Sequence, residues 1–255
     1  GIPTTRALSL TLTGEQVMRD MFYDGHSKLE PGAVVCRAAP SFTRFGHFEM
    51  LAARGEIDLL RQFSDYTIRA DFPDLAAPKN AADKTAYLEW FAEICWRTAA
   101  MIVDWMRVGF VHGVMNTDNF NITGETFDFG PWRFLPISDP NFTAAYFDQQ
   151  GLYRFGRQPL QGGWALQQLA SALLPLAGAE DLATGLKPYE RAYQESFVSH
   201  THAMLGIAPF GDPDADTEFL QAFYAWMTET GASWPQTFFD WFGGHESTSR
   251  ADASP

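Results

Sequence analysis

The sequence predicts an α+β fold that is mainly helical, with β-hairpin material at its N-terminal end. The first residues alternate apolar and polar side chains between glycine-containing turns, whereas later segments repeat apolar residues at helical spacing. Hydrophobic residues make up 46% of the chain, enough for a sizeable core. Because no repeat or linker interrupts the pattern, we expect one domain over 1–255, with a β-rich segment (1–40), a helical lobe (41–242) and a frayed tail (243–255).

The β-rich segment begins with a strand over Arg6–Leu12, in which every second residue from Leu8 is a leucine. Thr13-Gly14 predicts a turn. Glu15–Tyr23 fits either the partner strand or a helix that starts with a capping box. Pro31-Gly32 predicts a further turn, followed by a strand over Ala33–Ala38.

The clearest helix is predicted over Lys84–Arg107, where apolar residues recur every three or four positions until Gly109 ends the pattern. A shorter helix capped by Ser41 is expected to carry Phe45 and Leu51. The weaker patterns predict helices over 56–70, 164–176, 189–205 and 217–230, with loops over 72–83 and 131–161.

Charge and composition narrow the possible functions. The net charge of -13 argues against a nucleic-acid partner, because phosphate backbones need a basic surface. The two cysteines, Cys36 and Cys95, cannot build a disulfide framework or a zinc motif, which favours a reducing compartment. No apolar run reaches the ~18–20 residues of a membrane span, so we expect no membrane partner.

The most informative motif runs from His112 to Asn119 and is followed by Asp128-Phe129-Gly130. Asp118, Asn119 and Asp128 can each offer oxygen to a hard divalent cation. Protein kinases hold nucleotide-bound magnesium with a similar Asn and with the Asp of Asp-Phe-Gly. Each triplet alone is equally typical of an ordinary turn. Their order after a long helix favours a site for a metal ion and a nucleotide.

Two residues of this loop are expected to have no proton-transfer role. His112 follows an apolar pair, so a packed, hydrogen-bonded histidine is the preferred interpretation. In a kinase the base lies two residues after this histidine, but here that position is Val114, which cannot accept a proton. Asp118 is the nearest carboxylate on the loop, and ordinary phosphate transfer is disfavoured.

Arg37 and Arg44 flank a Pro-Ser pair and offer guanidinium groups that match phosphate oxygens. On composition alone, a salt bridge to one of the 31 acidic residues is the better interpretation.

Two other clusters of polar residues are not expected to form a site. Asp212–Asp216 lacks the later residues of a calcium loop and fits an acidic helix N-terminus, and His200–His202 fits a solvated helix face.

Several longer segments together resemble the selenoprotein O family of kinase-like protein adenylyltransferases. The resemblance covers about residues 1–176 well and the rest loosely, and it rests on the segments 1–10, 30–37, 39–46, 112–119, 128–131, 151–159 and 164–166.

The resemblance implies a protein-kinase-like C-lobe that transfers AMP from ATP to Ser, Thr or Tyr hydroxyls of proteins and releases pyrophosphate. By motif position, Asp118 would be the proton acceptor, and Asn119 and Asp128 would hold Mg²⁺ or Mn²⁺. Arg37 and Arg44, together with Asp128, would bind ATP. The resemblance thereby reverses the preference for structural salt bridges at the two arginines.

The same resemblance also leads to expectations about the family's other parts. Relatives carry upstream an N-lobe with a nucleotide loop, a Lys and a Glu, so we expect the N-lobe to be incomplete here. The family's C-terminal redox residue has no counterpart after Asp128. The alternative is therefore a catalytically silent pseudokinase module that binds nucleotide or protein, and activity of these 255 residues alone stays open. The expected compartment is the cytoplasm in a bacterium or the mitochondrion in a eukaryote.

Overall fold

The computed structural model describes residues 2–21, 24–75, 78 and 84–244. Over these residues the fold is α+β and mainly helical, with two small antiparallel sheets, as the sequence predicts. The elements, in chain order, are β1 (Arg6–Arg19), β2 (Lys28–Ala38), α1 (Phe45–Ala53), α2 (Ile57–Asp71), α3 (Lys84–Arg107), β3 (Phe110–Val111), η1 (Thr117–Asn119), β4 (Arg133–Phe134), η2 (Phe155–Arg157), α4 (Gln158–Leu173), α5 (Ala179–Met204), α6 (Pro213–Thr230) and α7 (Trp234–Trp241).

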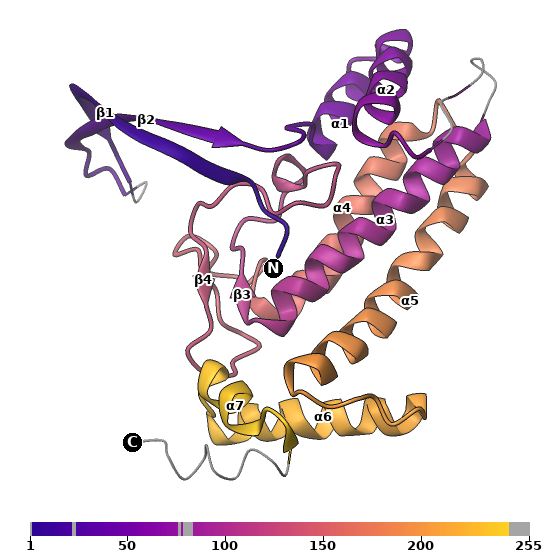
Figure 1. Ribbon diagram of the computed structural model, residues 1–255. Coiled ribbons are helices and arrows are strands. Elements are labelled where there is room, and N and C mark those ends of the chain that lie inside the picture. Colours follow the sequence, from indigo (N-terminus) through magenta and orange to yellow (C-terminus); the bar gives the residue numbers. More distant parts are fainter. Residues whose placement is uncertain (1, 22–23, 76–77, 79–83, 245–255) are drawn as a thin grey trace.

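Helix α3 is the central element of the helical body. It packs against α4 and α5, which run beside it in Figure 1. Its buried face includes Trp90, Ile94 and Trp105, all at helical spacing, so the amphipathic pattern that predicts the helix is also the pattern that builds the core. Gly109 follows the helix at a positive φ of 68° and turns the chain into β3.

Strands β1 and β2 form one antiparallel hairpin, in which Arg6 lies opposite Ala38. The pairing shifts register between Leu12 and Gln16, so Thr13-Gly14 forms a β-bulge and not the predicted turn. Glu15–Arg19 continues β1, which rules out both a helix there and a separate partner strand. Pro31-Gly32 was also wrongly predicted as a turn, because it lies inside β2.

The hairpin projects away from the helical body (Figure 1). All of β1 is exposed, and Leu8 and Leu10 retain 75% and 66% of their accessible surface. The alternation of leucines correctly predicts the strand. The buried face that such alternation normally indicates is not formed within the described part of the chain.

Four predicted helices start three or more residues away from the expected position, among them α6, which begins at Pro213 and not at residue 217. Helix α1 begins at Phe45 with Arg44 at the N-cap, while Ser41 forms a local turn by accepting a hydrogen bond from the Thr43 N–H. Helix α4 begins at Gln158, six positions before the expected start. Helix α5 begins at Ala179 and continues through Pro188, a residue that normally ends a helical pattern.

The C-terminal part adds one unexpected helix and one correction. Helix α7 and the two-residue strands β3 and β4 were not predicted. His202 is fully buried, so the predicted solvated face is wrong at this residue. Most of the expected frayed tail, residues 245–255, lies outside the described residues. Among the residues that are described, no helix has the length and apolar character needed to cross a bilayer.

Candidate functional site

The start of α1 is joined to the loop that carries Asp118 and Asn119. The Phe45 N–H donates to the Phe120 carbonyl at 3.1 Å, and the Ile122 N–H donates to the Thr43 carbonyl at 2.8 Å. These two bonds place Arg44 directly beside the η1 turn, although 74 residues separate it from Asp118.

His112 connects the two halves of the motif. Its Nδ1 accepts a hydrogen bond from the Val114 N–H at 3.3 Å, so Nε2 carries the proton and donates to the Phe127 carbonyl at 2.9 Å. Burial lowers the pKa of His112, and the bond to the Phe127 carbonyl and the charge of Asp128 only partly oppose this effect. His112 is therefore a packed, hydrogen-bonded histidine, as the sequence predicts.

The η1 turn fixes the orientation of the Asn119 side chain. The Asn116 side chain accepts the Asp118 N–H at 3.1 Å, which starts the turn. Asn119 is buried, and its Nδ2 donates to the Val114 carbonyl at 2.9 Å. Because the amide nitrogen is held in this way, the amide oxygen is the atom left to face a ligand.

Asp128 has an uncommon backbone conformation. Its φ of 62° makes it the only non-glycine residue with positive φ in the described part of the chain. Asp tolerates the left-handed region better than most side chains, but the conformation still costs free energy. The carboxylate is half-buried and acts electrostatically on His112, which places Asp128 on the same side as the loop motif.

Arg37 and Arg44 converge on one aromatic ring. Their guanidinium carbons lie 4.8 Å and 5.4 Å from the centre of the Phe127 ring, and Phe127 directly precedes Asp128. Arg37 donates to the Thr5 hydroxyl at 2.9 Å, and Arg44 Nη1 donates to the Asp118 carbonyl at 3.2 Å.

Within the described residues, neither Arg37 nor Arg44 forms an ion pair with a carboxylate. The structural salt bridge that composition alone favours is therefore not found there. The Nε atom of Arg44 is buried, and none of the described residues accepts a hydrogen bond from it. A buried donor without a partner is costly, and an anionic ligand would satisfy it.

The Asp118 side chain is exposed and lies against the first turn of α1. Its carboxylate touches the position where Gly46 would carry a β-carbon. Glycine at this position leaves the carboxylate room, and the exposed oxygens can meet a substrate from solvent.

Sequence reasoning missed Gly46, His47 and Phe127. Gly46 gives room to the Asp118 carboxylate, His47 contacts Arg44, and Phe127 gathers the two arginines. The only usable signal was the spacing of Arg44 and His47, because a side-chain acceptor three residues after an N-cap is typical of a capping box.

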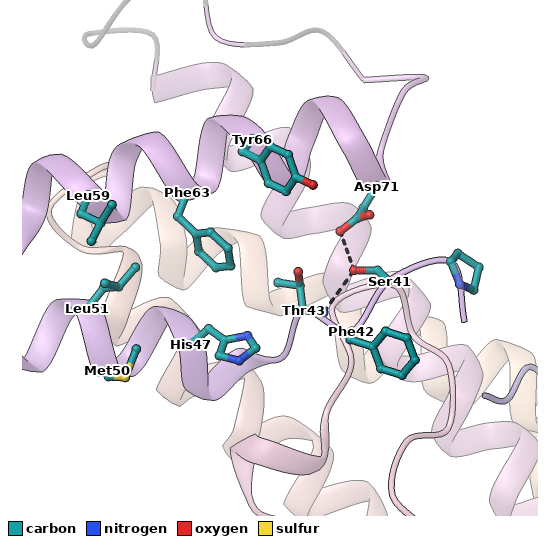
Figure 2. A pocket seen from close by; sticks show the side chains of 11 residues that line it. Ser41, Phe42, Thr43, His47, Met50, Leu51, Leu59, Phe63, Tyr66 and Asp71 are labelled. Carbon is teal, nitrogen blue, oxygen red and sulfur yellow. Dashed lines mark hydrogen bonds between the residues drawn. The ribbon is translucent and has the colours of Figure 1, made fainter. Parts of the chain in front are cut away.

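A cavity of about 490 Å³ opens beside the same helix (Figure 2). It lies between α1 and α2, and its walls include His47, Phe63 and Tyr66. At one end the Ser41 hydroxyl donates to Asp71 at 2.7 Å. The cavity brings solvent to the His47 ring.

Taken together, the site presents an exposed carboxylate, an available amide oxygen and a second carboxylate. It also presents two guanidinium groups that no carboxylate of the described chain pairs with. Oxygen donors suit a hard divalent cation, and guanidinium groups suit phosphate. The residues present therefore have the chemistry expected of the class of site that binds a phosphate-bearing ligand together with a cation.

Comparison with known proteins is consistent with this class. The family model described as protein adenylyltransferase SelO matches residues 1–254. A protein nucleotidyltransferase YdiU from Azoarcus sp. (strain BH72) is 52% identical over 229 residues, which are 89% of this chain and 43% of the relative. A protein of the same name from Xanthomonas campestris pv. campestris (strain B100) is 54% identical over 84% of this chain and 41% of the relative.

The chain belongs to the protein adenylyltransferase SelO family. It spans less than half the length of the curated relatives that it matches.

Proposed function

We propose that this chain supplies the catalytic loop, the metal ligands and two ATP-binding arginines of a protein adenylyltransferase. The enzyme would transfer AMP from ATP to Ser, Thr or Tyr hydroxyls of other proteins and release pyrophosphate. In this proposal, residues 41–242 are the helical lobe of a kinase-like fold and residues 1–40 lie on its hinge side. The observation that carries it is the pair Arg37 and Arg44, which both pack on Phe127 and have no carboxylate partner among the residues that the structure describes.

Arg37 and Arg44 would bind the phosphates of ATP. A guanidinium group can donate two parallel hydrogen bonds to phosphate oxygens, and the buried Nε of Arg44 has no acceptor within the described part of the chain. Phe127 holds both groups from one side, so little side-chain entropy remains to be lost when ATP binds.

Asn119 and Asp128 would hold Mg²⁺ or Mn²⁺ through the amide oxygen and the carboxylate. The bond from Asn119 to the Val114 carbonyl orients the first ligand, and the His112–Phe127 bond fixes the backbone next to the second. The bound cation would neutralise charge on the phosphates during the transfer.

Asp118 would accept the proton of the attacking hydroxyl. The hydroxyl oxygen forms a bond to the α-phosphorus, the bond from this phosphorus to the α–β bridging oxygen breaks, and pyrophosphate leaves with the electron pair. The exposed position of Asp118 allows a protein hydroxyl to approach from solvent. A general base of this kind contributes roughly 10²–10⁴-fold to the rate.

Labelled ATP tests the proposal on the intact protein. We expect α-³²P-ATP to label acceptor proteins and γ-³²P-ATP to leave them unlabelled. Transfer of the γ-label would show a protein kinase instead. Nucleotide binding without transfer of either label would show the silent pseudokinase module.

Variants assign the roles within the site. Asp118→Asn should lower kcat by roughly 10²–10⁴-fold, and Asp128→Ala should abolish labelling with the fold intact. Asp58→Ala, at an exposed carboxylate on α2, is the matched control and should label like the wild type. Undiminished labelling by Asp128→Ala would remove this residue from the metal site.

For the setting of this reaction we propose the cytoplasm of a bacterium. The curated relatives named above are bacterial proteins. Cys36 is exposed and unpaired, and such a thiol stays reduced in the cytoplasm.

A further inference from the structure

We propose that His47 is a positioning residue, which holds both the backbone and the guanidinium group of Arg44 in the geometry that binds ATP. This inference rests on the proposed function, because it assigns to His47 the preparation of the same phosphate-binding arginine. It is carried by the hydrogen bonding and packing of the His47 ring.

The His47 ring holds the backbone of Arg44. His47 is the third residue of α1, and its Nδ1 accepts the Arg44 N–H at 3.1 Å. This bond is half of a capping box, in which Glu or Gln normally supplies the acceptor. Because Nδ1 is the acceptor, the proton of the neutral ring lies on Nε2.

The same ring borders the side chain of Arg44. Nε2 of His47 lies 3.5 Å from Nη2 of Arg44, and since both nitrogens carry protons this is a packing contact and not a hydrogen bond. On its other side the guanidinium group packs on Phe127 and donates to the Asp118 carbonyl. The guanidinium group of Arg44 is therefore confined between His47 and Phe127.

Helix α2 fixes the ring in turn. The Phe63 ring meets His47 edge-on, with centroids 6.1 Å apart and an angle of 87°. The charged groups that act on the imidazole are Arg44 and Asp118, and Tyr66 and Asp71 line the same cavity (Figure 2).

Only the neutral imidazole ring of His47 can accept the Arg44 N–H. Burial lowers the pKa of His47 from 6.5, Arg44 lowers it further, and Asp118 partly opposes them. Near neutral pH the ring is therefore uncharged and accepts the Arg44 N–H. Below that lowered pKa, a proton on Nδ1 removes the acceptor and adds a positive charge beside the guanidinium group. We therefore expect acid to weaken ATP binding through His47.

The experiment compares wild type, His47→Ala and His47→Gln in the intact protein. At about pH 7.5, His47→Ala should raise both the KM and the dissociation constant for ATP about tenfold and change kcat less than about threefold, since the cap is lost but Asp118 remains. His47→Gln should stay within about threefold of the wild type, because its Oε1 can replace Nδ1. The part of the loss of ATP affinity in acid that comes from protonation of His47 should be absent in His47→Gln.

Two results would overturn this role. One is wild-type ATP affinity in His47→Ala, even with a lowered melting temperature, since that would show a purely structural residue. The other is an identical loss of ATP affinity at low pH in wild type and His47→Gln. His26→Gln, at an exposed histidine in the hairpin segment, is the control and should match the wild type throughout.

The dissociation constant of ATP also separates this inference from the proposed function. If the intact protein binds ATP but transfers no AMP, the proposed function fails. A tenfold weaker binding of ATP by His47→Ala, restored in His47→Gln, would support the positioning role in that case as well.

Discussion

The Asp118 carboxylate fills the space that a β-carbon would occupy at Gly46. A β-carbon built at Gly46 would overlap Oδ1 and would lie 3.1 Å from Cγ of Asp118. Gly46 is the second residue of α1, so the carboxylate rests on the helix end whose dipole attracts anions. The backbone of Gly46 is helical and would accept any residue. Glycine is required here because the Asp118 carboxylate approaches so closely.

Replacing Gly46 by alanine should therefore displace the proposed base and leave the fold intact. The methyl group would push the carboxylate out of place, so we expect kcat for AMP transfer to fall about 10²-fold. Alanine also favours the helix by up to about 1 kcal/mol relative to glycine, so the melting temperature should not fall.

Gly163→Ala is the control for this prediction. The new β-carbon in α4 would meet Cε1 of Tyr189 at an ordinary van der Waals distance of 3.4 Å. Activity should be unchanged there. Wild-type kcat in Gly46→Ala would show that the position of Asp118 does not limit the reaction.

The parts of the fold that the sequence predicts correctly are those decided by local pattern. Lys84–Arg107 has a continuous apolar face and a glycine soon after its end, and the predicted bounds of α3 are confirmed. Thr13-Gly14 was misassigned because a β-bulge with glycine at positive φ uses the same residues as a turn. The helix predicted over 189–205 begins at Ala179 and runs through Pro188, because packing against α3 overrides the local preference of proline to end a helix.

Burial of His112 should make the protein less stable in acid. Its pKa is lowered in the folded state, so below pH 6.5 the unfolded chain takes up a proton that the folded protein does not. The stabilising contribution is fully present above pH 6.5 and is lost as the pH falls through the lowered pKa. We expect the free energy of unfolding to fall by up to about 1.4 kcal/mol per pH unit in this window.

Urea unfolding of wild type and His112→Gln between about pH 7.5 and 5 measures this slope. The slope should be shallower in the variant. Part of it should remain, because burial also lowers the pKa of His47. An equal slope in both proteins would contradict the assignment to His112, and His26→Gln should leave the slope as it is in the wild type.

A buried contact between His202 and Asp216 joins α5 to α6. Nε2 of His202 lies 3.1 Å from Oδ1 of Asp216, and both side chains are almost fully buried. The same carboxylate oxygen accepts the Phe210 N–H at 2.8 Å. Asp216→Ala would remove the acceptor of the Phe210 N–H and leave a space beside the buried His202 ring, so we expect a loss of about 1–3 kcal/mol of unfolding free energy.

The exposed pair of Arg191 and Glu195 is the comparison for this contact. It has a shorter distance, 2.7 Å, but lies in solvent on one face of α5. Arg191→Ala should produce no measurable change in urea unfolding. A small effect of Asp216→Ala, similar to that of Arg191→Ala, would show that the buried Asp216 carboxylate does not stabilise the contact between α5 and α6.

The site was predictable where residue types are diagnostic. Asp118, Asn119 and Asp128 were identified as candidates because their order is specific, and they stay proposals as site residues. The groups that arrange them were not predictable. Both arginines pack on the Phe127 ring. Gly46 matters because it has no side chain and so leaves room for the Asp118 carboxylate. Such roles depend on contacts between segments far apart in the chain, which no local pattern records.

The left-handed backbone of Asp128 predicts that function and stability oppose each other there. At a φ of 62°, glycine avoids the steric cost that a β-carbon brings. Asp128→Gly should therefore raise the free energy of unfolding by about 1 kcal/mol while it abolishes AMP transfer, because the proposed metal ligand is gone. Asp128→Asn keeps the β-carbon and so should lower transfer without the gain in stability. Urea unfolding and α-³²P labelling of the three proteins test this, and a destabilised Asp128→Gly would show that the carboxylate holds the loop together instead of straining it.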